Sequence, residues 1–368
     1  MSIGRTRRQF LKASLAAALF AAGSAEADQE RLIVRSPRPQ DFETPLEYLD
    51  SYLTPNEVFF VRSHFGPPVI DPGQWRLEFD GLIQTSRVVT LNDLKKIPAV
   101  TLPATLQCAG NGRAFYQPPV PGAQWQYGGV GNAEWRGVRL VDVLKSLQPL
   151  PGAHHVQCVG YDLPPMPTVP AFKRSIPMER AMASDTLLAF EMNGEPLPVL
   201  HGGPLRLVVP GWAGENWTKW LRHITVQEKE ASGFYMEAGY RVPGKNGSKV
   251  PASVFPIKSL IARPADGTSM ALAPVTVAGV AFTGSGTVTE VEISTDNGAS
   301  WSKADLEPQK SPGAWQLWRY QWTPARPGKY VIAARATDST GAVQPDVTPW
   351  NKGGYLWNGI QRVRCELR

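Results

Sequence analysis

The chain has 368 residues, a formal net charge of +6 and 19% charged residues. This small excess of positive charge gives no reason to expect nucleic acid or a membrane surface as a partner, and no apolar run reaches the roughly 20 residues that span a bilayer. The 34 glycines and 34 prolines predict many turns and few long helices.

An export signal is predicted at residues 1–27. The stretch TRRQFLK contains paired arginines, the mainly apolar ASLAAALFAAG follows, and the small-x-small sequence AEA ends at Ala27. This order is typical of a secretory signal, and the twin arginines indicate the Tat pathway. Cleavage after Ala27 would remove four basic residues and one acidic residue and leave a net charge of +3. We therefore expect a mature protein in the periplasm; an amphipathic N-terminal helix is the alternative.

Residues 28–250 are predicted to form a domain of mixed α and β structure. The stretch 88–98 (VVTLNDLKKIP) predicts a strand and then a short helix capped by Asn92, and 136–148 (RGVRLVDVLKSLQ) repeats that arrangement. The buried face of the second helix is expected to carry Leu140, Val143 and Leu144. Further strands are predicted at 76–81, 105–110, 154–160, 205–211 and 223–229.

From about residue 255 apolar and polar residues alternate, which is typical of strands that bury one face. The pattern covers residues 275–306, 315–323, 328–341 and 360–367. Asp296-Asn297-Gly298 predicts a tight hairpin turn. Short strands at steady intervals predict an immunoglobulin-like β-sandwich over residues 251–368, joined through the Gly- and Pro-rich stretch 241–259. The predicted fold class is α+β: a mixed α/β domain followed by this sandwich.

Common catalytic motifs are absent from the sequence. It contains no CxxC or CxxCH, no GxxxxGK[ST] loop, no GxSxG elbow, and no HxxxH or HExxH pair among its five histidines. A zinc site, a covalently attached haem, a P-loop and a serine hydrolase are therefore all unsupported.

Cys108 stands alone at the end of an apolar strand, before the turn Gly110-Asn111-Gly112 and Arg113. A cysteine in such a strand is often a buried and inert hydrophobe. The tight turn and the nearby positive charge point instead to a reactive site, since positive charge favours the thiolate form that binds metals. A single thiolate without paired histidines fits a metal that arrives already chelated.

Basic residues recur in loops that follow strands, and such residues are costly to bury unless they meet anions. The set comprises Arg62, Arg113, His201, Arg206, Lys219, Arg241 and Lys352. Together they suit a ligand with a phosphate group and a small oxyanion beside it. Ordinary surface ion pairs are the alternative for part of this set.

These stretches resemble those of the sulfite oxidase-type molybdenum enzymes, and in particular bacterial periplasmic sulfite dehydrogenases without haem. The resemblance covers both predicted domains and nearly all of the mature chain. It rests on FFVRSH (59–64), TLQCAGNGR (105–113), EMNGEPLP (191–198), HGGPLRLVVPGWAGENWTKWL (201–221), GYR (239–241) and WNKGGYLWNGIQRVR (350–364).

The resemblance implies a role for twelve residues. Cys108 would bind the molybdenum of a molybdenum–molybdopterin group. The pocket where substrate reacts would be formed by Arg62, Arg113, Trp125, Tyr240 and Lys352. The pterin and its phosphate would be held by His64, Asp162, Ser175, His201, Arg206 and Lys219. Lys352 stands in a motif where the family often has arginine, and Asn216 where an arginine is sometimes found.

The implied activity is oxidation of sulfite to sulfate by oxygen-atom transfer at the molybdenum centre. Because CxxCH is absent, no haem is expected in this chain, and the electrons are expected to pass to a separate periplasmic c-type cytochrome. The C-terminal domain resembles the family's dimerisation domain. This implies a homodimer, with a heterodimer containing a cytochrome subunit left open.

Two other functions remain open at this stage. A periplasmic molybdopterin-dependent methionine sulfoxide reductase would share the signal and the metal-binding cysteine, but such enzymes usually lack the sandwich and act on a neutral substrate. An exported binding protein with a sandwich module would contain no metal, so the molybdenum content separates it from both enzymes. Cys158 and Cys365 are expected to be buried free thiols, with a disulfide between them as the alternative.

Overall fold

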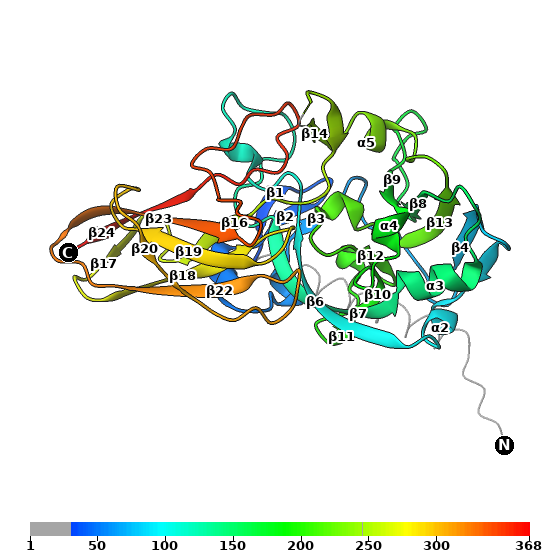
Figure 1. Ribbon diagram of the computed structural model, residues 1–368, viewed down its shortest axis with the longest axis horizontal. Helices are drawn as coiled ribbons and strands as arrows, with labels where there is room; N and C mark the ends of the chain where they lie inside the picture. Colours follow the sequence, from blue (N-terminus) through cyan, green and yellow to red (C-terminus); the bar gives the residue numbers. More distant parts are fainter. Residues whose placement is uncertain (1–30, 245) are drawn as a thin grey trace, which may run out of the picture.

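The computed structural model describes residues 31–244 and 246–368. The predicted export signal at residues 1–27 lies outside the described residues. The molecule is elongated, with a part of mixed α and β structure at one end and a β-sandwich that contains the C-terminus at the other (Figure 1). Within the described chain, no helix has the length and apolar character needed to cross a membrane.

Two five-stranded sheets form the framework of the first part. One has the strand order β11-β10-β7-β6, with β12 also paired to β10. Its strands are β6 (Ala99–Gln107), β7 (Val130–Arg139), β10 (Leu187–Met192), β11 (Glu195–Pro196) and β12 (Arg206–Val208). The other has the order β5-β4-β13-β8-β9. Its strands are β4 (Leu77–Gly81), β5 (Arg87–Val89), β8 (His155–Gly160), β9 (Lys173–Pro177) and β13 (Leu221–Gln227). Each of the strands predicted between 76 and 229 overlaps one of these elements.

A small sheet of three strands accompanies them, formed by β1 (Ile33–Ser36), β2 (Asp41–Glu43) and β3 (Val61–Arg62). The hydrophobic core shared by the two large sheets contains four tryptophans: Trp75, Trp125, Trp135 and Trp217. Trp135 Nε1 donates to the Ala104 carbonyl at 3.1 Å, and this bond pairs an indole N–H group that would be costly to bury alone. This core fixes the ends of β6 and β13, from which the site is built.

The helices are short, as the abundance of glycine and proline predicts. The α-helices are α2 (Leu91–Leu94), α3 (Leu140–Leu147), α4 (Met178–Ala181) and α5 (Phe234–Glu237). The 3-10 turns are η1 (Leu46–Asp50), η2 (Asn56–Val58), η3 (Arg113–Phe115), η4 (Val199–His201) and η5 (Gly214–Asn216). The residues expected on the buried face of α3 are all buried, which confirms that prediction.

The predicted cap of α2 was wrong by two residues. The helix is capped by Thr90, not by Asn92, which lies inside it. Thr90 Oγ1 accepts a hydrogen bond from the Asp93 N–H at 3.1 Å, and the Asp93 carboxylate accepts one from the Thr90 N–H at 3.1 Å. This reciprocal capping box satisfies two N–H groups at once, so Thr90 is favoured over the next polar residue.

The C-terminal part is a sandwich of two sheets, which confirms the predicted β-sandwich. The strand orders are β16-β18-β22-β21 and β17-β24-β23-β19-β20. The first sheet contains β16 (Lys258–Arg263), β18 (Val275–Phe282), β21 (Asp305–Leu306) and β22 (Gln316–Trp322). The second contains β17 (Thr268–Met270), β19 (Val288–Ser294), β20 (Ser302–Lys303), β23 (Gly328–Asp338) and β24 (Gln361–Leu367). The hairpin turn also appears as predicted, between β19 and β20, with positive φ at Asn297 and Gly298.

The stretch predicted as a joining segment is partly structured. Strands β14 (Arg241–Pro243) and β15 (Lys249–Pro251) pair within it as an antiparallel hairpin. A loop of the C-terminal part then returns to the first part near the end of β6: Leu356 N–H donates to the Ala109 carbonyl at 2.7 Å, and Trp350 Nε1 donates to the Pro118 carbonyl at 3.0 Å. Both parts of the chain therefore contribute to the region around Cys108.

Candidate active site

The main chain holds Cys108 in place one residue beyond β6. The Cys108 N–H donates to the Gly129 carbonyl at 2.9 Å, and the Cys108 carbonyl accepts from the Asn111 N–H at 2.9 Å. The Asn111 side chain closes the turn by accepting from the Gly129 N–H at 3.0 Å. Gly112 has φ +92°, and a Cβ there would lie 2.5 Å from the Trp357 ring. The glycine at this position is thus required by both conformation and space.

The Arg113 guanidinium lies between three loops. A Cβ on Gly110, Gly122 or Gly354 would come within 2.9 Å of the Arg113 side chain. The guanidinium donates to the Ala123 carbonyl at 3.1 Å and the Gly353 carbonyl at 3.3 Å. Among the described ion pairs Arg113 has no carboxylate partner. Its positive charge therefore remains available to an anion.

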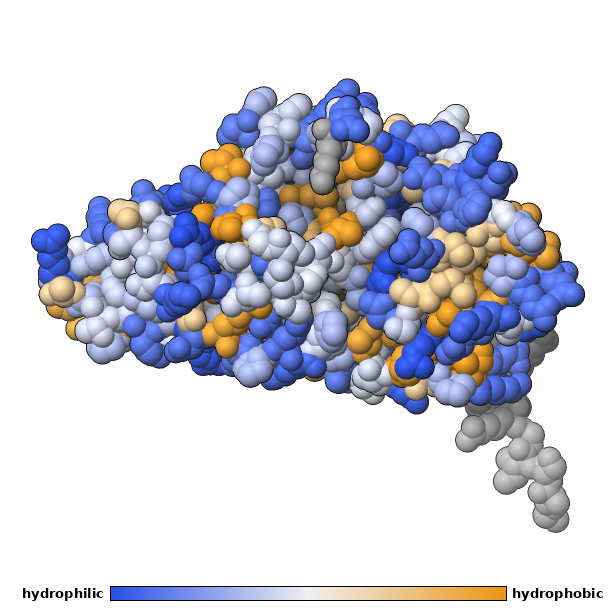
Figure 2. All heavy atoms as spheres, viewed as in Figure 1, coloured by the Kyte–Doolittle hydropathy of each residue, from blue (hydrophilic) through white to orange (hydrophobic). Residues whose placement is uncertain are grey.

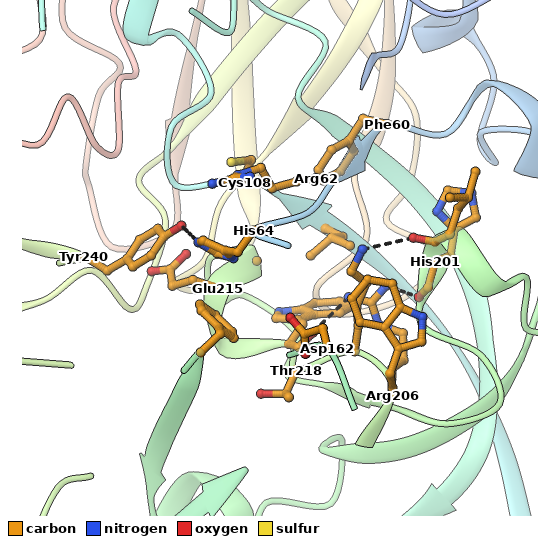
Figure 3. Close-up of a pocket in the computed structure, with 17 residues that line it drawn as sticks. Phe60, Arg62, His64, Cys108, Asp162, His201, Arg206, Glu215, Thr218 and Tyr240 are labelled. Atoms are coloured by element: carbon orange, nitrogen blue, oxygen red, sulfur yellow. Dashed lines mark hydrogen bonds between the residues drawn. The ribbon is translucent and has the colours of Figure 1, made fainter. Parts of the chain in front are cut away.

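Two pockets meet at Cys108. The inner pocket comprises about 700 Å³ of space free of protein atoms, part of it open to solvent, and is drawn in Figure 3. It is lined by Phe60, Arg62, His64, Leu106, Cys108, Asp162, Phe172, Leu200, His201, Arg206, Gly214, Glu215, Trp217, Thr218, Lys219, Trp220 and Tyr240. The outer pocket, of about 1080 Å³, is lined by Arg62, His64, Cys108, Gly110, Arg113, Pro119, Val120, Pro121, Gly122, Ala123, Phe234, Tyr235, Gly239, Tyr240, Trp350, Lys352, Gly353 and Tyr355.

Four residues line both pockets: Arg62, His64, Cys108 and Tyr240. A group held in the inner pocket would therefore meet a molecule in the outer pocket at these side chains.

The far side of the inner pocket from Tyr240 is cationic (Figure 3). Arg206 is buried and donates to the His201 carbonyl at 2.7 Å and the Trp217 carbonyl at 3.1 Å. Lys219 Nζ donates to the Leu200 carbonyl at 3.0 Å, and burial followed by repulsion from Arg206 lowers the pKa of Lys219 to about 7. Neither cation has a carboxylate within ion-pair distance in the described chain, so an anionic ligand would compensate both positive charges.

Two donor atoms on residues that line this pocket have no hydrogen-bond partner in the described chain: Arg206 Nε and Thr218 Oγ1. Buried polar atoms are normally paired, and a donor left without an acceptor costs free energy. A phosphate group offers acceptors that both could use. The donor set therefore fits a ligand with a phosphate at this end and a metal at the Cys108 end.

Tyr240 and His64 form a hydrogen-bonded pair between the pockets. Tyr240 has a φ of +54°, which is uncommon for a residue other than glycine. Its hydroxyl lies 2.8 Å from His64 Nε2, and its ring stacks on Tyr355 with centroids 5.0 Å apart. Burial, followed by repulsion from Arg62, lowers the pKa of His64 well below its usual value. The imidazole is therefore neutral, and the Tyr240 O–H can donate to it.

The positive charges near Cys108 favour its thiolate, as expected, but burial opposes them. Burial raises the pKa of the Cys108 thiol and outweighs the opposing effect of Arg62 and Arg113. Desolvation disfavours the charged form of a buried thiol. The thiol would lose its proton only when a metal ion binds the sulfur.

Arg62 is tied to a carboxylate beside the site. It forms an ion pair with the buried Asp41 at 3.0 Å. Burial opposes the charge of Arg62, but attraction to Tyr240, Asp41 and Cys108 is larger and raises the pKa of Arg62. The guanidinium is therefore positively charged and held in place at the junction of the pockets.

The rim of the outer pocket is open to solvent. Lys352 is exposed there, and Phe234 and Trp350 present apolar surface beside it. Hydrophobic residues gather near the centre of the face in Figure 2, at the junction of the two parts of the molecule. The outer pocket thus has a cationic floor and a partly apolar rim.

The structure brings together ten of the twelve residues predicted to form the site, and the roles of all twelve stay predictions. The two exceptions are Trp125 and Ser175, which line neither pocket. Trp125 is fully buried behind the site and contacts Phe60 edge-to-face, with ring centroids 6.0 Å apart. Ser175 Oγ accepts a hydrogen bond from the Ala231 N–H at 2.8 Å, so the hydroxyl oxygen bonds to the main chain and not to the pocket.

Several residues of the inner pocket escaped the sequence prediction. Glu215, Trp217, Thr218 and Trp220 all lie in GENWTKWL, the stretch from which only Lys219 was selected. Arg174, next to the selected Ser175, is buried and donates to Asn216 Oδ1 at 2.8 Å. This guanidinium lies 5.7 Å from the centre of the Tyr240 ring.

The remaining cysteines are buried free thiols, as expected. Cys158 lies in β8 and Cys365 in β24, in different sheets. In the described residues, no group of three or more His, Cys, Asp or Glu side chains is arranged to hold a metal ion. Cys108 is thus a candidate for a single protein ligand rather than a member of a cluster.

Comparison with known families divides the chain at the same region as the structure. Residues 64–235 match the family described as oxidoreductase molybdopterin binding domain, and residues 249–367 match the Mo-co oxidoreductase dimerisation domain.

Individual relatives match over most of the chain. Mitochondrial sulfite oxidase of Rattus norvegicus is 37% identical over 366 residues, covering 91% of this chain and 66% of the relative. Sulfite oxidase of Arabidopsis thaliana is 34% identical over 384 residues, covering 94% of this chain and 98% of the relative. The chain therefore spans slightly less than two thirds of the rat protein. The crystal structure of the sulfane dehydrogenase SoxCD from Paracoccus pantotrophus superposes with a TM-score of 0.79 at 31% identity, covering 89% of this chain and 84% of that one.

Proposed function

Since this chain belongs to the sulfite oxidase family of molybdopterin oxidoreductases, we propose that it oxidises sulfite to sulfate. The reaction consumes one water and releases two protons and two electrons. The observation that supports it best is the junction of the two pockets. There a single thiol, a fixed arginine and a tyrosine–histidine pair face both a site for a phosphate-bearing cofactor and an open cationic pocket.

The inner pocket would hold a molybdenum–molybdopterin group. Cys108 would bind the metal, and Arg206, Lys219 and the Thr218 hydroxyl would hold the phosphate, because these polar atoms and charges have no anionic partner in the described chain. Asp162 and His201 line the same pocket and would contact the pterin. When bound, this group supplies the transfer of an oxygen atom and accepts the two electrons.

The outer pocket would attract and orient the sulfite dianion. The half-buried Arg62 and the buried Arg113 supply two positive charges at its floor, and Lys352 supplies an exposed one at its rim. A charge that is aimed at a reacting anion in a water-poor pocket is worth far more than one in bulk water. The backbone acceptors around Arg113 keep its guanidinium from turning away.

Tyr240 and His64 would form the hydrogen-bonded pair next to the reacting atoms, where the protons of the reaction are released. The Tyr240 hydroxyl can donate a hydrogen bond to substrate or to His64, and the low pKa of His64 keeps its imidazole a neutral hydrogen-bond acceptor. The proximity of these groups to Cys108 places proton release next to the reacting atoms.

The electrons would leave to a separate c-type cytochrome in the periplasm, after export through the Tat pathway. The match to a dimerisation domain supports a homodimer through the C-terminal part. A heterodimer with a cytochrome subunit is the alternative. Mass measurement of the native periplasmic protein distinguishes the two assemblies.

A steady-state assay tests the proposed activity. Sulfite is supplied with ferricyanide or cytochrome c, and the molybdenum content of each sample is measured. The native protein is expected to contain molybdenum and to oxidise sulfite, and Cys108→Ser to lose the activity. Cys158→Ser, which replaces another buried thiol, serves as the control and is expected to stay active per bound molybdenum. Sulfite oxidation by Cys108→Ser would refute the role of the thiol, and native protein without molybdenum would refute the function.

One observation favours a second candidate, oxidation of a sulfane sulfur carried on a larger molecule. The outer pocket opens to solvent, and its rim includes the exposed apolar side chains of Phe234 and Trp350, which sulfite does not need. The SoxCD relative is described as a sulfane dehydrogenase. Comparison of kcat/KM for sulfite and for a peptide persulfide decides between the two: a higher value for the persulfide would favour the second candidate.

A further inference from the structure

Glu215 is a buried carboxylate without a hydrogen-bond donor. It lies in η5 at the wall of the inner pocket, its side chain is only 7% exposed, and neither carboxylate oxygen has a partner. Burial raises the pKa of Glu215 to about 7, and attraction to the nearby Arg174 opposes this shift without cancelling it. A protein normally pairs such a group, so the absence of a donor in the described chain calls for an explanation.

Most neighbouring donors bond to other groups, and Arg174 Nε, which has no partner, makes no hydrogen bond to Glu215. Both N–H groups of the Asn216 amide donate to carbonyls, those of Ala213 at 3.1 Å and Ala252 at 3.2 Å. The terminal nitrogens of Arg174 donate to the Tyr235 carbonyl and to Asn216 Oδ1. The carboxylate therefore faces the pocket with its acceptor capacity unused.

The position of Glu215 indicates a role toward the occupant of the inner pocket rather than toward substrate. Glu215 lines the inner pocket and is not among the residues that line the outer one. Its negative charge would also repel an anionic substrate. In Figure 3 it lies on the side of Tyr240 and His64, opposite Arg206 and His201. The pocket is thus polarised, with phosphate-binding cations at one side and an unpaired acceptor at the other.

We propose that Glu215 accepts hydrogen bonds from N–H groups of the bound pterin. A pterin carries ring N–H groups and an exocyclic amino group, which are donors of the kind that a carboxylate with two free oxygens accepts. This assignment rests on the proposed function, since it requires a pterin in the inner pocket. Together with Arg206 and Lys219 it gives the cofactor one orientation, because the phosphate and the N–H edge are recognised on different sides.

The test compares Glu215→Gln and Glu215→Ala with the native protein, with Glu78→Gln on the exposed face of β4 as the matched control. Each protein is prepared with cofactor and, from a host unable to make molybdopterin, without it. Pterin retained after prolonged dialysis is measured by fluorescence after oxidation, and the melting temperature is recorded for both forms.

Without cofactor, both Glu215 variants are expected to melt at or above the native temperature, because an unpaired buried carboxylate is removed. With cofactor, the gain in melting temperature on loading is expected to shrink and pterin loss to become roughly tenfold faster, since hydrogen bonds to charged groups are the stronger ones. Native pterin retention in both variants would overturn the assignment. Destabilisation of the cofactor-free variants would overturn it as well, because Glu215 would then be a structural partner of Arg174. Native protein without pterin would overturn the proposed function itself, which separates the two failures.

Discussion

Lys258 offers a quantitative test of how the sandwich supports the site. It is the first residue of β16, is fully buried, and inserts beneath the end of β6. Its Nζ donates to Gln107 Oε1 at 2.9 Å and lies 5.3 Å from the centre of the Trp357 ring. These interactions do not replace the hydration that the protonated ammonium group has in water. Burial therefore lowers the pKa of Lys258 from 10.5 to about 7.

The change in pKa sets the expected effect of Lys258→Met on the cofactor-free protein. A pKa of about 7 in place of 10.5 corresponds to about 5 kcal/mol of unfavourable free energy for the protonated amine. The unfolded chain keeps the proton up to pH 10.5, so this cost is fully present below pH 7 and declines to zero as the pH rises to 10.5. The substitution also removes the hydrogen bond to Gln107 and alters the packing of the side chain. To first approximation, these changes affect the free energy of unfolding equally at every pH. The advantage of Lys258→Met in free energy of unfolding should therefore be about 5 kcal/mol larger at pH 6 than at pH 10.5.

Urea unfolding followed by tryptophan fluorescence at several pH values between 6 and 10.5 measures this difference. Lys329→Met, at an exposed position of β23, is the control and should show little pH-dependent difference from the native protein. A difference between Lys258→Met and the native protein that stays constant with pH would refute the reasoning. It would show that the amine keeps its charge at no cost inside the protein.

Three further predictions concern the site. Arg113→Met is expected to lower kcat/KM for sulfite by an amount equivalent to about 2–4 kcal/mol. Arg241→Met should change kcat/KM little, because the Arg241 guanidinium is paired with a glutamate at 2.7 Å. Equal losses in the two variants would contradict the assignment of Arg113. Tyr240→Phe removes the hydroxyl bound to His64 and is expected to lower kcat more than KM and to alter the pH profile of kcat; an unchanged profile would exclude a role in proton transfer. Arg206→Met should lower the molybdenum and pterin content while the rate per bound molybdenum stays near native; full cofactor content would show that Arg206 does not hold the phosphate.

The local elements followed closely from the sequence because their signals are short-range. Alternation of apolar and polar residues predicted the sandwich strands, and helical spacing placed Leu140, Val143 and Leu144 on the buried face of α3. The Asp296-Asn297-Gly298 turn needs only positive φ at two adjacent residues, which the sequence itself supplies. The predicted cap of α2 was wrong although capping also depends only on neighbouring residues. Thr90 and Asn92 are both residue types that cap helices well, and only the reciprocal hydrogen bonds with Asp93 favour Thr90.

Motif residues gathered into one site because each lies close to the end of a strand. Cys108 directly follows β6, Arg206 begins β12, and Lys219 lies two residues before β13, and all three line the inner pocket. The sequence could not tell which side of a strand faces the pocket. Arg174 and Ser175 are adjacent in β9, yet the arginine reaches Asn216 and the ring of Tyr240 while the serine bonds to main chain.

The sequence by itself determined the order of domains, the turn that holds Cys108 and the set of cations around it, because these depend on residue type and spacing. Only the tertiary structure decided how each charge is solvated. It buried Glu215 without a donor, inserted Lys258 from the other part of the chain beneath β6, and raised the pKa of Cys108 against two nearby arginines. Desolvation depends on every atom packed around a group, and most of those atoms come from residues distant in sequence.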